Sequence, residues 1–136
     1  MNLEGCAEIE VSSEDRMHPI EGALLPGNGG GWRAAAPGKQ TIRVVFDAAQ
    51  TVRRMRLVFL EEHRERTQEF VLRYTTTADG GTPREILRQQ YNFSPIASEV
   101  EDYAVNLEGV KSVELEINPA INGDSVPASL AEWRIG

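Results

Sequence analysis

Apolar and polar residues alternate with a period of two in several stretches of the chain, and this pattern restricts the possible folds more than any other feature. In TVRRMRLVFLEE (51–62), apolar residues occupy every second position from Met55 to Phe59. Successive side chains of a β-strand point to opposite faces, so the alternation predicts antiparallel strands with one buried face. The expected inward-facing residues of 51–62, 69–77 and 112–118 are Met55, Leu57, Phe59, Phe70, Leu72, Tyr74, Val113, Leu115 and Ile117. Val71, Arg73 and Thr75 are expected to face outward.

The remaining chain also reads as strands separated by turns. Further strands are predicted at 8–12, 41–47, 86–93, 103–107 and 130–135, and turns at 79–81, 108–109 and 122–124, where Gly, Asn and Asp tolerate a positive φ. Residues 83–90 (PREILRQQ) also fit a short helix, so both alternatives stay open. About eight strands without a strong helix predict an all-β fold, either a two-sheet sandwich or a barrel. A length of 136 residues without a linker or repeat predicts a single domain over 1–136.

The composition of the chain argues against several classes of function. The net charge of −7 argues against nucleic acid as the main partner, because neutralising phosphates requires a basic surface. No apolar run approaches the roughly 18 residues of a membrane span. The N-terminal residues lack the features of a secretory signal, and Cys6 is the only cysteine, so a cytoplasmic location is expected. No nucleophile elbow, phosphate loop or metalloprotease motif occurs, which argues against an enzyme.

Charged residues are unevenly distributed. Residues 43–73 contain seven arginines against five acidic residues, whereas 94–136 contain eight acidic residues against Lys111 and Arg134. On adjacent antiparallel strands, such side chains are expected to form cross-strand pairs. The charged run at 60–69 is predicted to be either a solvated hairpin or part of a groove. Tyr91 and Phe93 are expected either to form an aromatic platform or to pack into the core.

Three segments, in this order, resemble a known family. They are SSEDRMHPIEGALLPGNGGGWRAAAPGKQTIRVVFDAAQTVRRMRLVF (12–59), EFVLRYTTTADGG (69–81) and SLAEWRIG (129–136). Together they resemble the discoidin or coagulation-factor C-type domain. The resemblance implies a galactose-binding-like jelly-roll β-sandwich of about eight antiparallel strands. The run around Trp32 is also similar to the N-terminal domain of the animal single-strand-break-repair scaffold protein, which implies partner binding on the same fold.

The resemblance also implies roles for particular residues. Trp32 is expected to pack beneath its loop, with ligand stacking as the alternative, and Arg33 to bind nearby carbonyls or Glu132. Sugar-binding members hold ligands in loops at one end, using arginine, histidine and aromatic side chains. The candidate ligand-binding residues are His18, Asn28, Arg33, Glu61, His63, Arg64, Arg66 and Asn122. Members often bind a structural calcium, for which Asn28 and Glu132 are the candidate ligands, although Pro26 replaces the usual aspartate. No other cofactor is expected.

The sequence therefore predicts a non-catalytic recognition module. Carbohydrate binding through the loops at 12–33, 60–66 and 118–126 is the leading hypothesis. The alternative is a protein-interaction module in an intracellular assembly, for which an oligomer is possible and a strand face or edge would form the binding surface.

Overall fold

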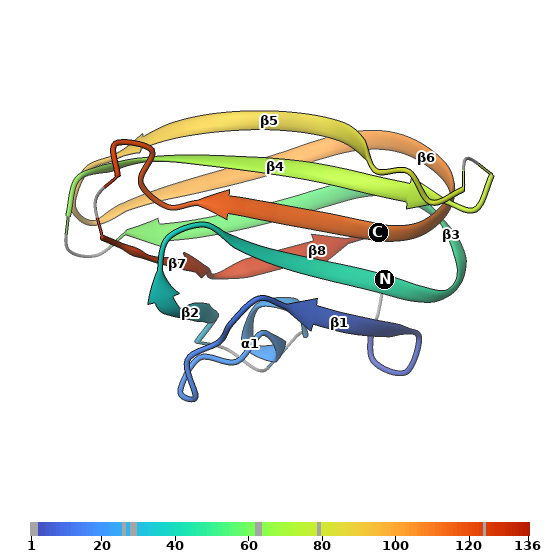
Figure 1. The fold of residues 1–136 in the computed structure, drawn as a ribbon, viewed down its shortest axis with the longest axis horizontal. Coiled ribbons are helices and arrows are strands. Elements are labelled where there is room, and N and C mark those ends of the chain that lie inside the picture. The colour runs from blue at the N-terminus through green and yellow to red at the C-terminus, as the bar shows by residue number, and fades with distance from the viewer. Residues whose placement is uncertain (1–2, 26, 28–29, 62–63, 79, 124) are drawn as a thin grey trace.

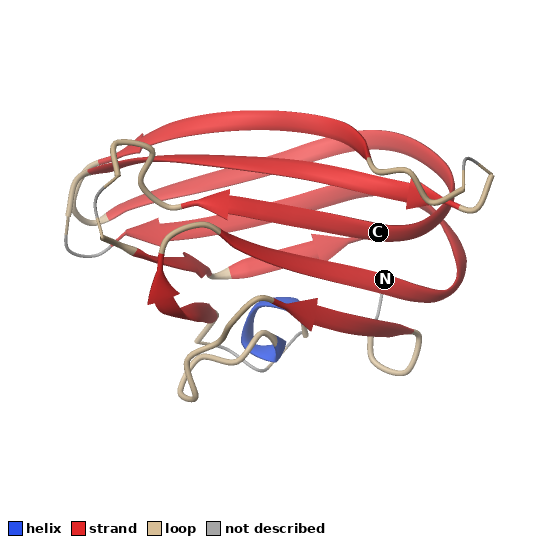
Figure 2. Ribbon diagram, viewed as in Figure 1, coloured by secondary structure: helices blue, strands red, loops and turns tan. Residues whose placement is uncertain are grey.

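The computed structural model describes residues 3–25, 27, 30–61, 64–78, 80–123 and 125–136. Almost all regular structure is β (Figures 1 and 2). The elements are β1 (Ala7–Val11), α1 (Glu21–Leu24), β2 (Trp32–Pro37), β3 (Gln40–Glu61), β4 (Arg66–Thr76), β5 (Arg84–Phe93), β6 (Ala97–Asn118), β7 (Pro127–Leu130) and β8 (Glu132–Ile135). In the described part of the chain, the four-residue α1 is too short to span a bilayer.

Two long strands, β3 and β6, connect the layers of the molecule. Residues 40–45 of β3 pair with 112–117 of β6, and this half of the pair is flanked by β1 on one side and by β4 and β5 on the other. Residues 50–61 of β3 pair with 97–110 of β6 and with β8. Figure 1 shows both ribbons bending back at one end of the molecule. The result is the predicted antiparallel β-sandwich: β1, β3, β4, β5, β6 and β8 form one bent six-stranded sheet, and β2 pairs with β7 in a separate two-stranded sheet.

The bend of β3 and β6 corrects several predicted boundaries. Residues 41–47 and 51–62 were expected to be separate strands but are the two halves of β3, with register shifts between Val45 and Arg54. The turn expected at 108–109 lies instead within β6, where Gly109 has a φ of 65°. Such irregularities increase local bending without ending the strand pairing. Residues 84–93 form β5, so the helical alternative for this segment is wrong.

The alternation correctly identified most of the core. Its inward-facing residues on β3, β4 and β6 are buried, although Tyr74 is only partly so. Val71 and Thr75 were expected to be outward-facing and solvated, but are 2% and 7% exposed. The Thr75 hydroxyl shares a 2.5 Å hydrogen bond with Ser112. These outer positions are buried because neighbouring side chains cover them, which a pattern along one strand does not reveal.

Ion pairs on the outer face confirm the predicted pairing of arginines with acidic residues. Val71 lies opposite Arg88 of β5 and Glu116 of β6. Arg88 is 2.8 Å from Glu69, and Arg73 is 3.1 Å from Glu116. The aliphatic stems of long charged side chains cover apolar surface while their charged groups stay solvated, which accounts for the burial of Val71.

Trp32 anchors the long first loop to the core, as predicted. It is 2% exposed, and its Nε1 donates a hydrogen bond to the Ser13 carbonyl at 3.0 Å. The preceding Gly31 has a φ of 68°, and a Cβ there would lie 2.8 Å from the Leu130 carbonyl oxygen. Glycine is needed where backbone segments approach this closely. The close approach of Gly31 to Leu130 therefore holds the start of β2 against β7.

A carboxyl group, that of Glu99, is buried in the sandwich. It lies opposite Phe59 and is 2% exposed, and neither of its oxygens accepts a hydrogen bond from a described residue. Burial is the main cause that raises the pKa of Glu99 to about 8, and the nearby charge of Glu101 adds to it, although Arg66 opposes this shift. Burial of an ionised carboxylate is costly, so the neutral form is favoured in the folded state.

We expect Glu99→Gln to stabilise the protein above neutral pH. The unfolded chain loses the Glu99 proton near pH 4.5, whereas the folded chain retains it until about pH 8. Stability of the natural chain therefore falls as pH rises between these values, by at most about 1.4 kcal/mol per pH unit. The variant lacks this fall, so its stability relative to the natural chain should rise by up to about 4 kcal/mol between pH 4.5 and pH 8. Urea denaturation from pH 4 to 9 measures the difference, and equal pH profiles of the two proteins would contradict it.

Candidate functional site

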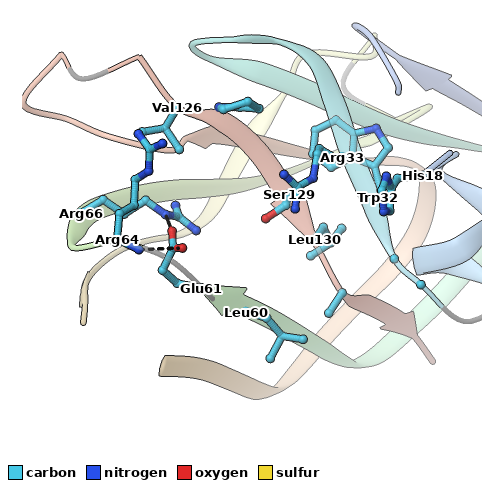
Figure 3. A pocket seen from close by; sticks show the side chains of 14 residues that line it. His18, Trp32, Arg33, Leu60, Glu61, Arg64, Arg66, Val126, Ser129 and Leu130 are labelled. Carbon is cyan, nitrogen blue, oxygen red and sulfur yellow. Dashed lines mark hydrogen bonds and ion pairs between the residues drawn. The ribbon is translucent and has the colours of Figure 1, made fainter. Parts of the chain in front are cut away.

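A cleft of about 240 Å³ lies at the end of the sandwich opposite the bend of β3 and β6. The start of β2, the strand β7 with its flanking residues, and the β3–β4 connection form its walls. The lining residues are His18, Gly30, Gly31, Trp32, Arg33, Leu60, Glu61, Arg64, Arg66, Val126, Pro127, Ser129, Leu130 and Ala131. Figure 3 shows Glu61, Arg64 and Arg66 on one side and His18, Trp32 and Arg33 on the other.

The cleft brings together five of the predicted ligand-binding residues. They come from three distant segments: His18 from the first loop, Arg33 from β2, and Glu61, Arg64 and Arg66 from the charged run around the β3–β4 connection. Asn122 does not line the cleft. Asn28 and His63 lie outside the described residues. The groove alternative for residues 60–69 therefore agrees with the structure, while the ligand roles of these residues stay predictions.

Arg33 extends from β2 at the position that pairs with Ser129 of β7. Its backbone is held in place, since its N–H donates to His18 and its carbonyl accepts from Asp15. Its guanidinium has no hydrogen bond or ion pair with any described residue. The expected contact with Glu132 is wrong, because that carboxylate pairs with Arg56 at 3.4 Å and Arg134 at 3.2 Å.

Arg66 and Glu61 form a buried ion pair in the opposite wall. The Arg66 Nε lies 2.6 Å from Glu61 Oε1, and the two side chains are 2% and 10% exposed. Arg66 Nη1 also donates to Gln68 and to the Pro119 carbonyl, and its guanidinium carbon is 4.4 Å from the centre of the Phe93 ring. All of these contacts are internal, so Arg66 builds the wall more than it faces the cleft.

Arg64 differs from Arg66 although both come from the same charged run. Its backbone N–H donates to Glu61 Oε2 at 3.2 Å, which fixes the chain where it leaves β3. Its guanidinium, like that of Arg33, has no hydrogen bond or ion pair with a described residue. Two guanidinium groups on opposite sides of the cleft thus keep their hydrogen-bonding capacity (Figure 3).

His18 adds an imidazole beside Arg33. Its Nδ1 is 3.8 Å from Asp15 Oδ2, too far for a hydrogen bond, and this buried nitrogen has no hydrogen-bond partner among the described residues. The His18 N–H donates to the Asp15 carbonyl and the His18 carbonyl accepts from the Arg33 N–H, which holds this part of the loop. The side chain is therefore positioned through its backbone.

Several lining residues were not named as ligand-binding candidates, although Leu60 and Val126 lie at the ends of the predicted binding loops 60–66 and 118–126. Ser129, Val126 and Pro127 enter the cleft because β7 pairs with β2, and Leu60 does so because it ends the outward face of β3. Pairing of β2 with β7 joins segments almost a hundred residues apart, and nothing in either segment encodes it. Leu60 is 48% exposed, and this exposure is visible only in the structure.

Aromatic residues at this end mainly build the wall. Trp32 lines the cleft but is 2% exposed, which favours the packing interpretation over ligand stacking. Phe93 is equally buried, and its ring centre is 4.9 Å from that of Tyr91 in an edge-on arrangement. Phe93 thus packs into the core beneath Arg66, and only Tyr91 of this pair is partly exposed.

The described residues do not fit the calcium site that the resemblance implies. Calcium needs several oxygen ligands, some of them anionic. Glu132 is already paired with Arg56 and Arg134, whose positive charges disfavour a cation there. No group of three metal-ligating side chains occurs within the described part of the chain, and Asn28 lies outside it.

Comparison with solved structures identifies the fold. The family 32 carbohydrate-binding module of C. perfringens NanJ, in complex with galactose, is 13% identical, with a TM-score of 0.67 and coverage of 93% of this chain and 90% of that module. A chitosan-binding module from a Paenibacillus chitosanase/glucanase is 18% identical, with a TM-score of 0.68 and coverage of 100% and 98%. The AlyQ family 32 module, in complex with 4,5-unsaturated mannuronic acid, is 17% identical, with a TM-score of 0.61 and coverage of 95% and 93%.

Other similar structures are larger glycoside hydrolases, of which this chain covers 26% and 30%. No protein-family model and no curated protein matches the sequence. The structural likenesses show that the chain has the galactose-binding-like jelly-roll fold. They confirm the fold predicted from the resemblance to the discoidin domain.

Proposed function

We propose that this protein is a non-catalytic carbohydrate-binding module whose ligand occupies the cleft between β2, β7 and the β3–β4 connection. The observation that carries the proposal is the convergence of Arg33, Arg64 and His18 on one cleft, where the two guanidinium groups have no hydrogen bond or ion pair with a described residue. Folds host many functions, so the site must carry the argument. The likeness to modules solved with galactose and with an unsaturated mannuronic acid supports this choice.

The lining chemistry suits a sugar. Guanidinium and imidazole groups supply fixed donors, and the Ser129 hydroxyl both donates and accepts, which matches the paired hydroxyls of a pyranose ring. Leu60, Val126 and Pro127 offer apolar contact for the C–H faces of the ring. A few convergent polar groups beside apolar contacts are typical of ligand sites.

The contacts of Glu61 support sugar binding rather than sugar cleavage. Glycoside hydrolysis usually requires one carboxyl group as acid and a second as base or nucleophile. Glu61 lies in the wall but its oxygens are held by the Arg66 Nε and the Arg64 backbone N–H. It is therefore not free to transfer a proton to a bound sugar.

Filling the cleft should abolish sugar binding. Ser129→Tyr places a large side chain between the two walls, so we expect at least about a tenfold loss of affinity for any saccharide identified on a glycan array. Thr51→Tyr, at the exposed bend of β3, is the matched control and should bind as the natural chain does. Isothermal titration calorimetry measures both variants, with circular dichroism to verify folding. Unchanged binding by folded Ser129→Tyr would exclude this cleft.

A protein-interaction module is the second candidate, and an apolar patch favours it. Leu60 and Val100 are 48% and 51% exposed on the outward face shared by β3 and β6, where Val100 lies opposite Val58. Exposed apolar side chains that cluster can mark interfaces. Light scattering distinguishes the two candidates. A stable dimer or a captured protein, without any glycan signal, would favour this second function. The cytoplasmic location stays a prediction under either function.

A further inference from the structure

We propose that the cleft selects saccharides that carry a carboxylate, such as uronic acids, over neutral sugars. This inference rests on the proposed function, because it concerns the ligand of the same cleft. It follows from the charges of the described lining, from their partners, and from the burial of the aromatic residue beside them.

The described lining has an excess of positive charge. It contains Arg33, Arg64 and Arg66 against one carboxylate, that of Glu61. Arg66 and Glu61 lie 2.6 Å apart and neutralise one another. The charges of Arg33 and Arg64 are therefore uncompensated within the described residues, although the chain as a whole has a net charge of −7.

These two arginines differ from most others in the chain. Arginines that pair with a carboxylate are Arg43, Arg54, Arg56, Arg66, Arg73, Arg88 and Arg134. Acidic residues are abundant in this protein, so an arginine without an acidic partner is notable here. Arg33 and Arg64 lie on opposite walls of the same cleft. This arrangement indicates a site that binds an anionic group.

The geometry of the guanidinium group favours a carboxylate over other anions. It is planar and presents parallel N–H donors that match the two oxygens of a carboxylate, and such charge-assisted bonds are about twice as strong as neutral ones. His18 lies beside Arg33, and the Ser129 hydroxyl lies at the paired position on β7. These groups remain for the sugar hydroxyls after the arginines bind the carboxylate.

Burial of Trp32 strengthens the argument. With 2% exposure and its Nε1 bound to the Ser13 carbonyl, Trp32 does not offer its ring face to a ligand. Within the described lining, discrimination among sugars therefore depends on polar and charged contacts. At physiological ionic strength, charges more than about 8 Å away are largely screened, so the local arginines outweigh the negative charge of the whole chain.

Calorimetry with four ligands tests the proposal on the full chain: trigalacturonate, its methyl ester, neutral galactotriose and galactose 6-sulfate. We expect trigalacturonate to bind at least about tenfold more tightly than the methyl ester and galactotriose, since each charge-assisted bond contributes about a tenfold change in affinity or more. Arg33→Gln and Arg64→Gln should each reduce this preference. Arg53→Gln is the matched control, because Arg53 lies at the distant bend and its guanidinium donates a hydrogen bond to Asn106.

Each outcome has a distinct meaning. Equal affinities for the acid, its ester and the neutral sugar would overturn the carboxylate preference but leave sugar binding intact. Tighter binding of the sulfate than of trigalacturonate would show that the cleft prefers another anion and would also overturn it. A preference for the acid that survives both arginine variants, each folded by circular dichroism, would reject the assigned residues. Binding of no saccharide on a wider array would instead reject the proposed function.

Discussion

Trp32→Ala is expected to lower the free energy of unfolding by about 3–5 kcal/mol, as truncations of large buried aromatic residues do. Trp32 is among the largest fully buried side chains of the core, and it connects the first loop, β2 and β7. Its removal leaves a cavity and also leaves the Ser13 carbonyl without its indole partner. Urea denaturation followed by circular dichroism measures the loss, and a change below about 1 kcal/mol would show that Trp32 does not anchor the loop.

Phenylalanine variants separate packing from hydrogen bonding in this prediction. Trp32→Phe keeps most of the apolar volume but loses the bond to Ser13. Trp133 is equally buried, yet its Nε1 has no hydrogen-bond partner among the described residues. Trp133→Phe therefore removes no such bond, and Trp32→Phe should cost about 1 kcal/mol more. Equal costs would mean that the indole hydrogen bond contributes nothing.

The sequence pattern predicted the strands well because one face of each is buried. Met55, Leu57 and Phe59 alternate with polar residues, and the period of two follows directly from strand geometry. The pattern failed where burial arises from partners on other strands. Val71 is buried by neighbours on β4, β5 and β6, and Gly109 lies within a strand because the pairing continues past it.

The sequence predicted which types of residue line the cleft, but not how these residues are arranged. Residues such as Arg33 and Arg64 are polar groups beside irregular segments, where binding residues often occur, so the sequence selected them. Ser129 has no such signal, since it enters the cleft only because β7 pairs with β2. Arg66 shows that residue type and position do not reveal the partners of a side chain. Its residue type and position resemble those of Arg64, but its guanidinium is consumed by Glu61, Gln68 and Pro119.

Loss of the buried Arg66 guanidinium is the second substitution for which we expect a large effect on stability. We expect Arg66→Ala to lower the free energy of unfolding by about 3–5 kcal/mol, because it leaves the Glu61 carboxylate buried without a cationic partner. It also removes the hydrogen bonds to Gln68 and Pro119 and the contact with Phe93. Arg54→Ala is the matched control. Arg54 pairs with Asp102 at 2.5 Å but is 70% exposed, so its loss should cost much less stability than the loss of Arg66.

A double variant distinguishes a structural role of Arg66 from a ligand contact. Arg66→Met combined with Glu61→Met replaces both charges with apolar groups, and such replacements of buried pairs are often neutral or stabilising. We expect the double variant to recover most of the stability that Arg66→Ala loses, and to retain sugar affinity within about threefold. Retained stability with lost affinity would instead assign Arg66 to the ligand. Since Arg33 and Arg64 remain in this variant, its preference for acidic over neutral sugars should also persist.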